Sequence, residues 1–343
     1  MTILITGGAG YIGSHAVFAF QDAGYAVAVV DNLSTGRREA VPDGVRFFEG
    51  DVGDEAFLQA LFESQKISSV VHFAGSLIVP ESVERPLAYY RNNTVASRNL
   101  LEACVKAGVR RFIFSSTCAV YGVADRLPLS EDSPRNPINP YGRSKLMTEW
   151  MLQDAAKAHD LLFISLRYFN VAGADLAGRA GQSTPNATQL IKVACEAAVG
   201  LRDSVTVFGE DYDTPDGTCI RDYIHVSDLA DAHVLALRYL DAGGESRVLN
   251  CGYGHGFSVR QVLETVQQVS GRDLAIRSGP RRAGDPPALL ADVSRIRDVL
   301  GWRPAHDDLS EIVASALRWE RLLQAPDYDS CARRRRLPVD IRL

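Results

Sequence analysis

The chain has 343 residues, a length that suggests two domains or one large domain with an added lobe. Hydrophobic residues make up 46% of it and charged residues 23%, which is typical of a protein that buries a full core. The formal net charge of -5 argues against nucleic acid or an anionic membrane as the main partner.

The chain shows no sign of secretion or membrane insertion. Its apolar start, MTILIT, runs directly into glycines, and no apolar stretch reaches the roughly 18 residues that a membrane span requires. The cysteines form no CxxC pair and no metal-ligand spacing, so we expect free thiols, a cytoplasmic location and no metal site. They lie at positions 104, 118, 195, 219, 251 and 331.

From residue 2 to about 170, short apolar runs alternate with helical patterns. The runs predict strands: TILIT, AVAVVD, VRFFEGDV, SSVVHFAG, RRFIFSST and LFISLRYFN. Helices are expected at 11–23, 54–65, 92–107 and 142–158. This alternation indicates an α/β fold, a doubly wound parallel sheet of the Rossmann type with helices on both faces. We assign residues 1–170 to this domain, together with part of 219–245.

The remainder, 171–343, is expected to form a smaller mixed α/β domain that covers the carboxyl ends of the strands. After a connection rich in Gly, Thr and Pro, it contains a helix near 187–199 and strands in VTVFG and RVLNCG. Ser258 and Gly271 are expected to begin and end one helix. Two more helical patterns follow, DVSRIRDVLGW and LSEIVASALRWERLL, and the basic run 333–336 is interpreted as a solvated tail.

The first strand is followed by a glycine-rich turn, TGGAGYIG. Gly7, Gly10 and Gly13 give the spacing GxxGxxG, which allows a tight turn and a close approach of the backbone to a pyrophosphate at a helix N-terminus. Asp31 ends the second strand, where a carboxylate binds a ribose diol and favours NAD over NADP. Asp51, at the end of the third strand, is a candidate contact on the adenine side.

The stretch NPYGRSK places Tyr141 and Lys145 four residues apart. If Pro140 opens a helix, the phenol and the ammonium project from one face. A nearby cation stabilises a phenolate, so we expect the pKa of Tyr141 to fall. A fall from near 10 to about 7 requires about 4 kcal/mol, which the ammonium and a cationic ligand together could supply. By themselves these seven residues also fit a solvent-facing pair on an amphipathic helix.

The glycine turn, the SST at 115–117 and the YxxxK pattern resemble the extended short-chain dehydrogenase/reductases. Within them, the chain resembles most closely the family of UDP-glucose 4-epimerases, from residue 2 to about 320. The resemblance also rests on VVDNLSTG, FSSTCAVYG, LRYFNVAGAD, DGTCIRDYIHVSDLADAH and RRAGDPPALLAD. It implies an NAD-dependent isomerase that interconverts UDP-glucose and UDP-galactose and forms a homodimer through the helices at 92–107 and 142–158.

The resemblance also implies the roles of individual residues. Tyr141 is the expected acid/base, Lys145 its electrostatic partner, and Thr117 the residue that orients or relays the proton of the sugar's 4-hydroxyl. The residues expected to hold NAD are Gly7, Gly10, Tyr11, Ile12, Gly13, Asp31, Asn32, Asp51, Val52, Phe73, Asn92, Ser115, Tyr141, Lys145 and Tyr168. Those expected to bind the UDP-hexose are Thr117, Asn170, Phe208, Arg221, Arg282, Asp285 and Leu289.

Several alternatives remain open from the sequence. Taken alone, Arg221 could pair with Asp222, Phe208 could belong to the core, and His225 is expected to be a packed histidine. Leu77 replaces a lysine that reaches the cofactor's ribose in many relatives. Leu289 is intermediate in size, which leaves N-acetylated sugars as possible substrates.

Three alternative functions follow. A 4-epimerase of UDP-xylose and UDP-arabinose would use the same residues, and so would one of UDP-N-acetylhexosamines. Family members that dehydrate sugars carry an acidic pair where this chain has Cys118 and Ala119, which argues against dehydration. A non-catalytic NAD-sensing protein is a remote alternative, because the intact Tyr141 and Lys145 argue against it.

Overall fold

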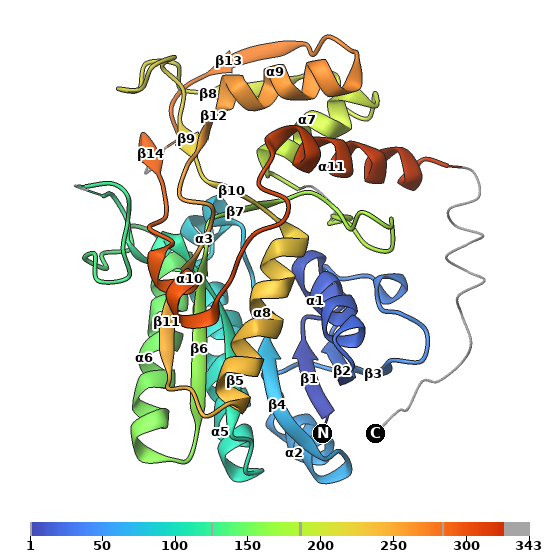
Figure 1. Cartoon of the computed structure of the whole chain (residues 1–343), viewed down its shortest axis with the longest axis vertical. Helices are drawn as coiled ribbons and strands as arrows, with labels where there is room; N and C mark the ends of the chain where they lie inside the picture. Colours follow the sequence, from blue (N-terminus) through green and yellow to red (C-terminus); the bar gives the residue numbers. More distant parts are fainter. Residues whose placement is uncertain (1, 125, 185–186, 283–284, 326–343) are drawn as a thin grey trace.

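The computed structural model describes residues 2–124, 126–184, 187–282 and 285–325. The basic run at 333–336 lies outside the described residues. Figure 1 shows a helix-covered sheet with a smaller lobe above the carboxyl ends of its strands. Within the described part of the chain, no helix is both long and apolar enough to span a bilayer.

The main sheet has seven strands in the order β11-β6-β5-β4-β1-β2-β3, and every neighbouring pair is parallel. The predicted doubly wound parallel sheet is therefore confirmed. The order reverses between β1 and β4, which opens a crevice at their carboxyl ends. The strands are β1 (Thr2–Thr6), β2 (Ala26–Asp31), β3 (Arg46–Glu49), β4 (Ile67–His72), β5 (Arg111–Thr117), β6 (Leu162–Tyr168) and β11 (Arg247–Cys251).

Helices cover both faces of this sheet, because its strands are apolar on both sides. Ile3 and Ile5 of β1 enter one core, and Leu4 between them enters the other. On the first face lie α1 (Tyr11–Asp22) and α8 (Val226–Asp241), which pack against each other. On the second face lie α2 (Glu55–Ser64), α5 (Ala96–Lys106) and α6 (Pro140–Ala158).

Capping residues define the ends of several helices. Asn139 caps α6 by accepting the Gly142 N–H at 2.8 Å, and Pro140 fills the first position of the helix. Ser258 forms a capping box at the start of α9 (Val259–Ser270), and Gly271 ends that helix with a φ of 70°, as the sequence predicts.

The lobe combines helices with short strands. Its helices are α7 (Leu190–Ala198), α9 and α11 (Leu309–Leu323), while α10 (Ser294–Leu300) contacts β11. Its paired strands are β8 (Val205–Phe208) with β13 (Ile276–Gly279), and β9 (Ile220–Arg221) with β12 (Phe257–Ser258) and β14 (Ala288–Leu289).

The remaining elements connect the lobe and the sheet. β7 (Asn170–Ala172) pairs with β10 (Tyr223–His225). Between β4 and α5 lie α3 (Val79–Glu84), α4 (Pro86–Tyr89) and the π-helical turn η2 (Tyr90–Val95). The short 3-10 turns are η1 (Arg38–Ala40) and η3 (Cys118–Val120).

Candidate active site

The glycine turn between β1 and α1 forms a closely packed cradle. Gly7 has a φ of 71°, and a Cβ at Gly13 would lie 2.1 Å from the Gly7 carbonyl oxygen, so no larger residue fits at position 13. Gly10 caps α1 without a side chain, so the first N–H groups of the helix face outward from the turn. This arrangement of backbone donors fits the pyrophosphate of a dinucleotide.

Carboxylates lie at the ends of β2 and β3, next to this cradle. Asp31 accepts the Ala9 N–H and the Leu33 N–H, both at 2.9 Å, with a different oxygen for each. Burial raises the pKa of Asp31, and the two N–H groups oppose that rise. Asn32 donates to Asp51 at 3.1 Å, so these two predicted cofactor ligands lie together. Each Asp31 oxygen keeps a lone pair that a ribose hydroxyl can use.

Other predicted cofactor residues surround the crevice. The phenol of Tyr11 donates to the Gly173 carbonyl at 2.6 Å, so its hydroxyl proton is used within the protein. The hydroxyl of Tyr168 contacts His233, whose ring also packs against Phe73. Ile12 is partly exposed in the first turn of α1, and Val52 is buried.

Tyr141 and Lys145 lie one turn apart on α6, and both reach the end of β5. The phenol of Tyr141 is hydrogen-bonded to Thr117. The Lys145 Nζ donates to the Ser115 carbonyl oxygen at 2.8 Å. The structure therefore brings the three predicted catalytic residues together at the carboxyl end of a central strand, beside the crevice.

The predicted fall in the pKa of Tyr141 is wrong for the protein chain alone. Burial raises the pKa of Tyr141 to about 12, and the hydrogen bond from Thr117 only partly opposes this. Lys145 does not counter it, because its ammonium is directed to the Ser115 carbonyl, and burial lowers the pKa of Lys145 to about 8. The sequence shows the i, i+4 spacing but not how deeply the pair is buried.

The loop after β4 is bound to η2 and α6 by the side-chain amides of two adjacent asparagines. Asn92 donates to the Ser76 hydroxyl at 2.8 Å. Asn93 accepts the Ser76 N–H at 2.7 Å and donates to the Ser76 carbonyl and to the Ser144 hydroxyl. Sequence reasoning identified Asn92 but missed Asn93, although the adjacent asparagines in RNNT were a visible signal. Leu77 is 48% exposed and makes no polar contribution to this network.

The predicted substrate residues lie on the lobe side of the crevice. Arg221 forms an ion pair with Asp285 at 3.7 Å, and Leu289 pairs with Arg221 across β14 and β9. Arg221 does not pair with Asp222, which instead accepts backbone N–H groups of Tyr253 and Gly254. The charge of Arg221 also reaches the thiol next to Thr117, where it opposes the burial that raises the pKa of Cys118 to about 12.

Phe208 and Arg282 are stacked on each other at the edge of the lobe. The guanidinium carbon of Arg282 lies 4.1 Å from the centre of the Phe208 ring. Phe208 is 36% exposed, so it is not a core residue. Asn170 is partly exposed in β7, where its N–H donates to the Asp222 carbonyl at 2.9 Å. The Phe208 ring and the Arg282 guanidinium are thus available together to contact a ligand.

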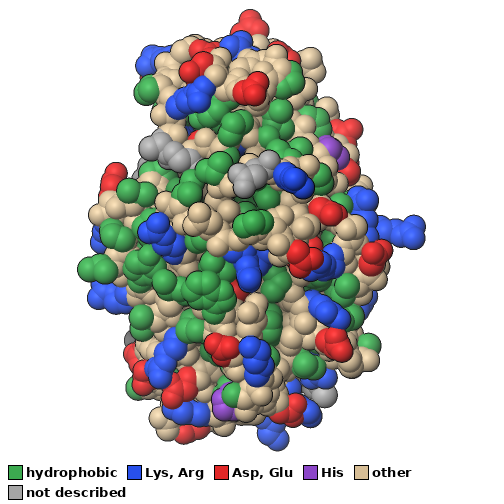
Figure 2. Space-filling view, turned by 90° about the vertical axis from the view of Figure 1, so that its left-hand side faces the viewer, with side chains coloured by type: hydrophobic (Ala, Val, Ile, Leu, Met, Phe, Trp, Pro, Cys, Tyr) green, Lys and Arg blue, Asp and Glu red, His purple; other side chains and the backbone are tan. Residues whose placement is uncertain are grey.

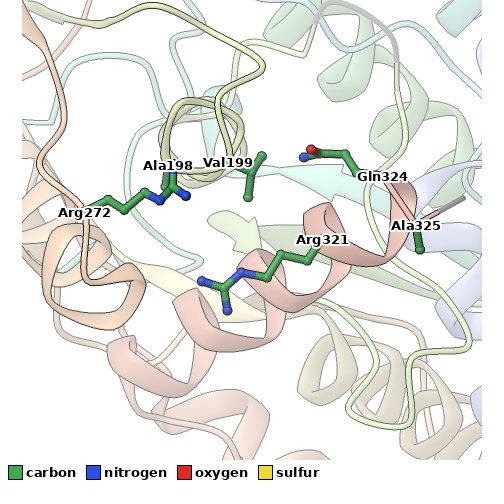
Figure 3. A pocket seen from close by; sticks show the side chains of 6 residues that line it. All are labelled: Ala198, Val199, Arg272, Arg321, Gln324 and Ala325. Carbon is green, nitrogen blue, oxygen red and sulfur yellow. The ribbon is translucent and has the colours of Figure 1, made fainter.

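A separate pocket lies at the far side of the lobe and contains none of these residues. Figure 3 shows Arg272 and Arg321 directed into it, beside the C-terminal ends of α7 and α11. Its remaining lining residues are Ala198, Val199, Gln324 and Ala325. It plays no part in the candidate active site.

Comparison with known proteins gives both a family and close relatives. The model of the "NAD dependent epimerase/dehydratase family" matches residues 3–252. A UDP-glucose 4-epimerase from Azospirillum brasilense is 59% identical over 322 residues, which are 94% of this chain and 92% of that protein.

Solved structures of similar proteins have the same fold. The UDP-glucose 4-epimerase of Brucella ovis, crystallised with NAD, has a TM-score of 0.89 at 47% identity, covering 93% of this chain and 98% of its own. The UDP-Glc/GlcNAc 4-epimerase of Campylobacter jejuni has a TM-score of 0.82 at 52% identity, covering 93% of this chain and 99% of its own.

Proposed function

Because the chain belongs to the NAD dependent epimerase/dehydratase family, we propose that it is an isomerase that interconverts UDP-glucose and UDP-galactose with NAD as its cofactor. The observation that carries the proposal is the contact of Tyr141 with Thr117 and of Lys145 with Ser115 at the end of β5. The close relatives named UDP-glucose 4-epimerase support it over a non-catalytic NAD-sensing role.

The chemistry explains why a redox cofactor is required. The C4 carbon of the sugar has no acidic proton, so simple deprotonation cannot invert it. When bound, NAD accepts a hydride from C4 and returns it, and its cationic ring lowers the pKa of a nearby phenol. We assign the binding of NAD to the glycine cradle, Asp31, Asn32 and the loop after β4.

The protein's own residues move the proton and hold the sugar. The Tyr141 phenolate oxygen takes the proton of the 4-hydroxyl and later returns it to the oxygen of the 4-keto group. Thr117 orients that hydroxyl through its contact with Tyr141. Lys145 is the proposed partner of the phenolate, a role that requires its ammonium to turn from the Ser115 carbonyl toward Tyr141. Since burial raises the pKa of Tyr141 to about 12, the phenol remains protonated until a positive charge enters the crevice.

The turnover of the 4-keto sugar requires an anchor away from the reacting carbon. Arg221 and Arg282 are suited to bind the diphosphate, because guanidinium groups match phosphate oxygens in geometry and charge. Asp285 is the expected partner of the uridine ribose, and Phe208 of the uracil ring. Binding then requires Arg282 to leave the Phe208 ring, which it now covers.

Substitution of Tyr141 tests the proposed function. Tyr141→Phe is expected to retain NAD but to lose turnover by about 100-fold or more, the usual contribution of a general acid/base. A coupled assay with UDP-glucose, UDP-xylose and UDP-N-acetylglucosamine measures turnover and also distinguishes the alternative sugars. Tyr239→Phe, which removes a hydroxyl that accepts the Glu245 N–H near the C-terminal end of α8, is the control. Unchanged turnover in Tyr141→Phe would remove this residue from the mechanism.

We also propose that two copies associate through α5, α6 and the neighbouring short helices. Figure 2 shows apolar side chains gathered in the middle of the face that contains α6. Exposed apolar residues on these adjoining elements are Val83, Leu87, Val95 and Trp150, with exposures of 63%, 79%, 50% and 49%. Burying such a patch stabilises a dimer.

Sizing chromatography at micromolar concentration tests the dimer. The unmodified chain is expected to elute as a dimer and Leu87→Asp as a monomer, because a carboxylate in the patch opposes its burial. Leu201→Asp changes an equally apolar, 56% exposed residue of the lobe and is expected to remain dimeric. A monomeric unmodified chain would contradict the proposal.

A cytoplasmic location is supported by the described cysteines, which are free thiols.

A further inference from the structure

A buried ion pair lies directly behind the candidate catalytic residues. Glu149 on α6 and Arg167 on β6 have side chains that are 0% and 1% exposed. The Arg167 Nε donates to one carboxylate oxygen at 2.9 Å and its Nη2 to the other at 2.6 Å. Two parallel hydrogen bonds of this kind fix the relative orientation of the two side chains and also strengthen their attraction. Neither residue is among those that the sequence predicts for the site.

The pair belongs to a regular series of contacts between α6 and β5. Ser116 donates to Glu149 at 2.5 Å, while its two neighbours in β5 bind Lys145 and Tyr141. Residues 141, 145 and 149 share one face of α6, one turn apart. Three successive residues of β5 therefore hold three successive turns of α6, and Glu149 is the third of these attachments.

From Arg167 the network continues toward the lobe. Its Nη1 donates to the Tyr121 hydroxyl at 2.9 Å and to the Glu131 carbonyl at 3.2 Å. The Tyr121 hydroxyl in turn donates to the Asn250 Oδ1 at 2.6 Å. The Tyr121 hydroxyl can make both hydrogen bonds, because it accepts one from the Arg167 guanidinium and donates the other to the Asn250 amide oxygen.

Asn250 connects this network to the segment that follows β14, the strand that contains the predicted substrate residue Leu289. Its Nδ2 donates to the Leu129 carbonyl at 2.7 Å, which also accepts the Asp292 N–H at 2.7 Å. The Leu129 N–H donates to the Leu290 carbonyl at 2.8 Å. Leu290 directly follows Leu289, so the network runs from the catalytic helix to the substrate side of the lobe.

We propose that Glu149 and Arg167 are positioning residues for the epimerisation, which fix the Tyr141–Lys145 face of α6 against β5 and align it with the substrate lobe. The proposal rests on the proposed function. The reaction needs the phenol correctly placed twice, once for each face of the sugar. A displacement near 1 Å can cost about 100-fold in rate, so a rigid attachment behind the site matters for catalysis as well as folding.

Glu149→Gln tests the proposal with little change of shape. The amide still accepts from Ser116, but it leaves the Arg167 cation without a counter-charge. We expect kcat to fall about tenfold or more and the KM for UDP-glucose to stay within about twofold, because the loss concerns placement of the phenol rather than anchoring of the diphosphate. Absorbance at about 340 nm should reveal NADH left behind when misplaced keto sugar escapes.

The matched control is Glu320→Gln. Glu320 forms another buried pair, with Lys192 at 2.5 Å, and their side chains are 2% and 5% exposed. This pair joins α11 to α7 within the lobe, away from α6. We expect kcat within about twofold of the unmodified chain, since no catalytic group is attached to it. Hydrogen exchange of residues 140–147 should rise in Glu149→Gln and not in Glu320→Gln.

Tyr121→Phe keeps the test decisive if Glu149→Gln does not fold. It removes only the hydroxyl between Arg167 and Asn250, so we expect faster exchange at 140–147 and a lower kcat. Either variant with unchanged kcat and exchange, or an equal loss in Glu320→Gln, would overturn the proposal. If the unmodified chain did not epimerise UDP-sugars, the proposed function would fail, while the exchange data would still report on the attachment of α6.

Discussion

Lys145 is an unusual lysine because its ammonium is held inside the protein. Its side chain is 5% exposed, its Nζ donates to the Ser115 carbonyl, and the Phe114 ring lies 4.9 Å away. Burial lowers the pKa of Lys145 from 10.5 to about 8. The positive charge is therefore maintained at neutral pH, but at a cost in stability that is justified by its place beside Tyr141.

This cost predicts a pH dependence of stability. Between the folded pKa of about 8 and the unfolded value of 10.5, the unfolded chain binds more protons at Lys145, so this residue makes stability rise with pH. This difference in pKa corresponds to about 3 kcal/mol in the free energy of unfolding. Urea unfolding from pH 7.5 to 10 should show a steeper rise for the unmodified chain than for Lys145→Met. Identical slopes would show that folding does not lower the pKa of Lys145.

The spacing of Tyr141 and Lys145 was predictable from the sequence, because i and i+4 share a face in any helix. The direction of the pKa change of Tyr141 was not, because it depends on burial by segments distant in the chain. The same limit applies to Asp228, in the first turn of α8. His225 is the N-cap of this helix, and the Asp228 carboxylate accepts the N–H groups of Ala305 and His306, which lie far away in the chain.

At the scale of elements, the turn between β1 and α1 combines two requirements in a few residues. It must reverse the chain tightly, and it must leave the first N–H groups of α1 free for a ligand. The Gly10 N–H donates to Gly7 at 3.1 Å, and Gly13 lies against the same carbonyl. A side chain at position 13 would push the first turn of α1 away from the backbone at Gly7.

Gly13→Ala is therefore expected to abolish the retention of NAD. Its Cβ would lie 2.1 Å from the Gly7 carbonyl oxygen, which neither backbone segment can accommodate without moving the cradle. The bound cofactor can be measured after denaturation of the purified protein. Gly24→Ala is the control, because Gly24 also has a positive φ, of 85°, but open space around it. It should lose stability and retain NAD; NAD retention by Gly13→Ala would contradict the proposed cradle.

Long elements were predictable and short ones were not. The six strands expected before residue 170 all occur, because each is a continuous apolar run that carries its own signal. β9, β12 and β14 have two residues each and exist only through partners far away in the chain. The strand RVLNCG was expected in the C-terminal half, but as β11 it pairs with β6 at the edge of the main sheet.

At the scale of the whole molecule, two cores lie on opposite faces of one sheet, and the larger extends into the lobe. Buried histidines are placed within this structure as neutral hydrogen-bonding groups. His72 bridges the Thr6 and Ser97 hydroxyls at 2.7 Å each, and Ser97 donates onward to the Asn93 carbonyl. Since Ser97 has one proton to donate, the His72 Nε2 must carry the hydrogen between them.

Acid should therefore unfold this protein unusually early. Burial lowers the pKa of His15 and His233 to about 4, and of His72 and His225 to about 3. Below the unfolded value of 6.5 the unfolded chain binds more protons, so stability falls as pH drops toward these folded values. From pH 6.5 to 5 each histidine lowers the free energy of unfolding by about 2 kcal/mol. The four losses together approach the total stability of a typical domain. Urea midpoints between pH 7.5 and 5 measure the fall. His159→Gln, at the exposed end of α6, should leave the slope unchanged, and a flat profile would show that burial does not lower the pKa of these histidines.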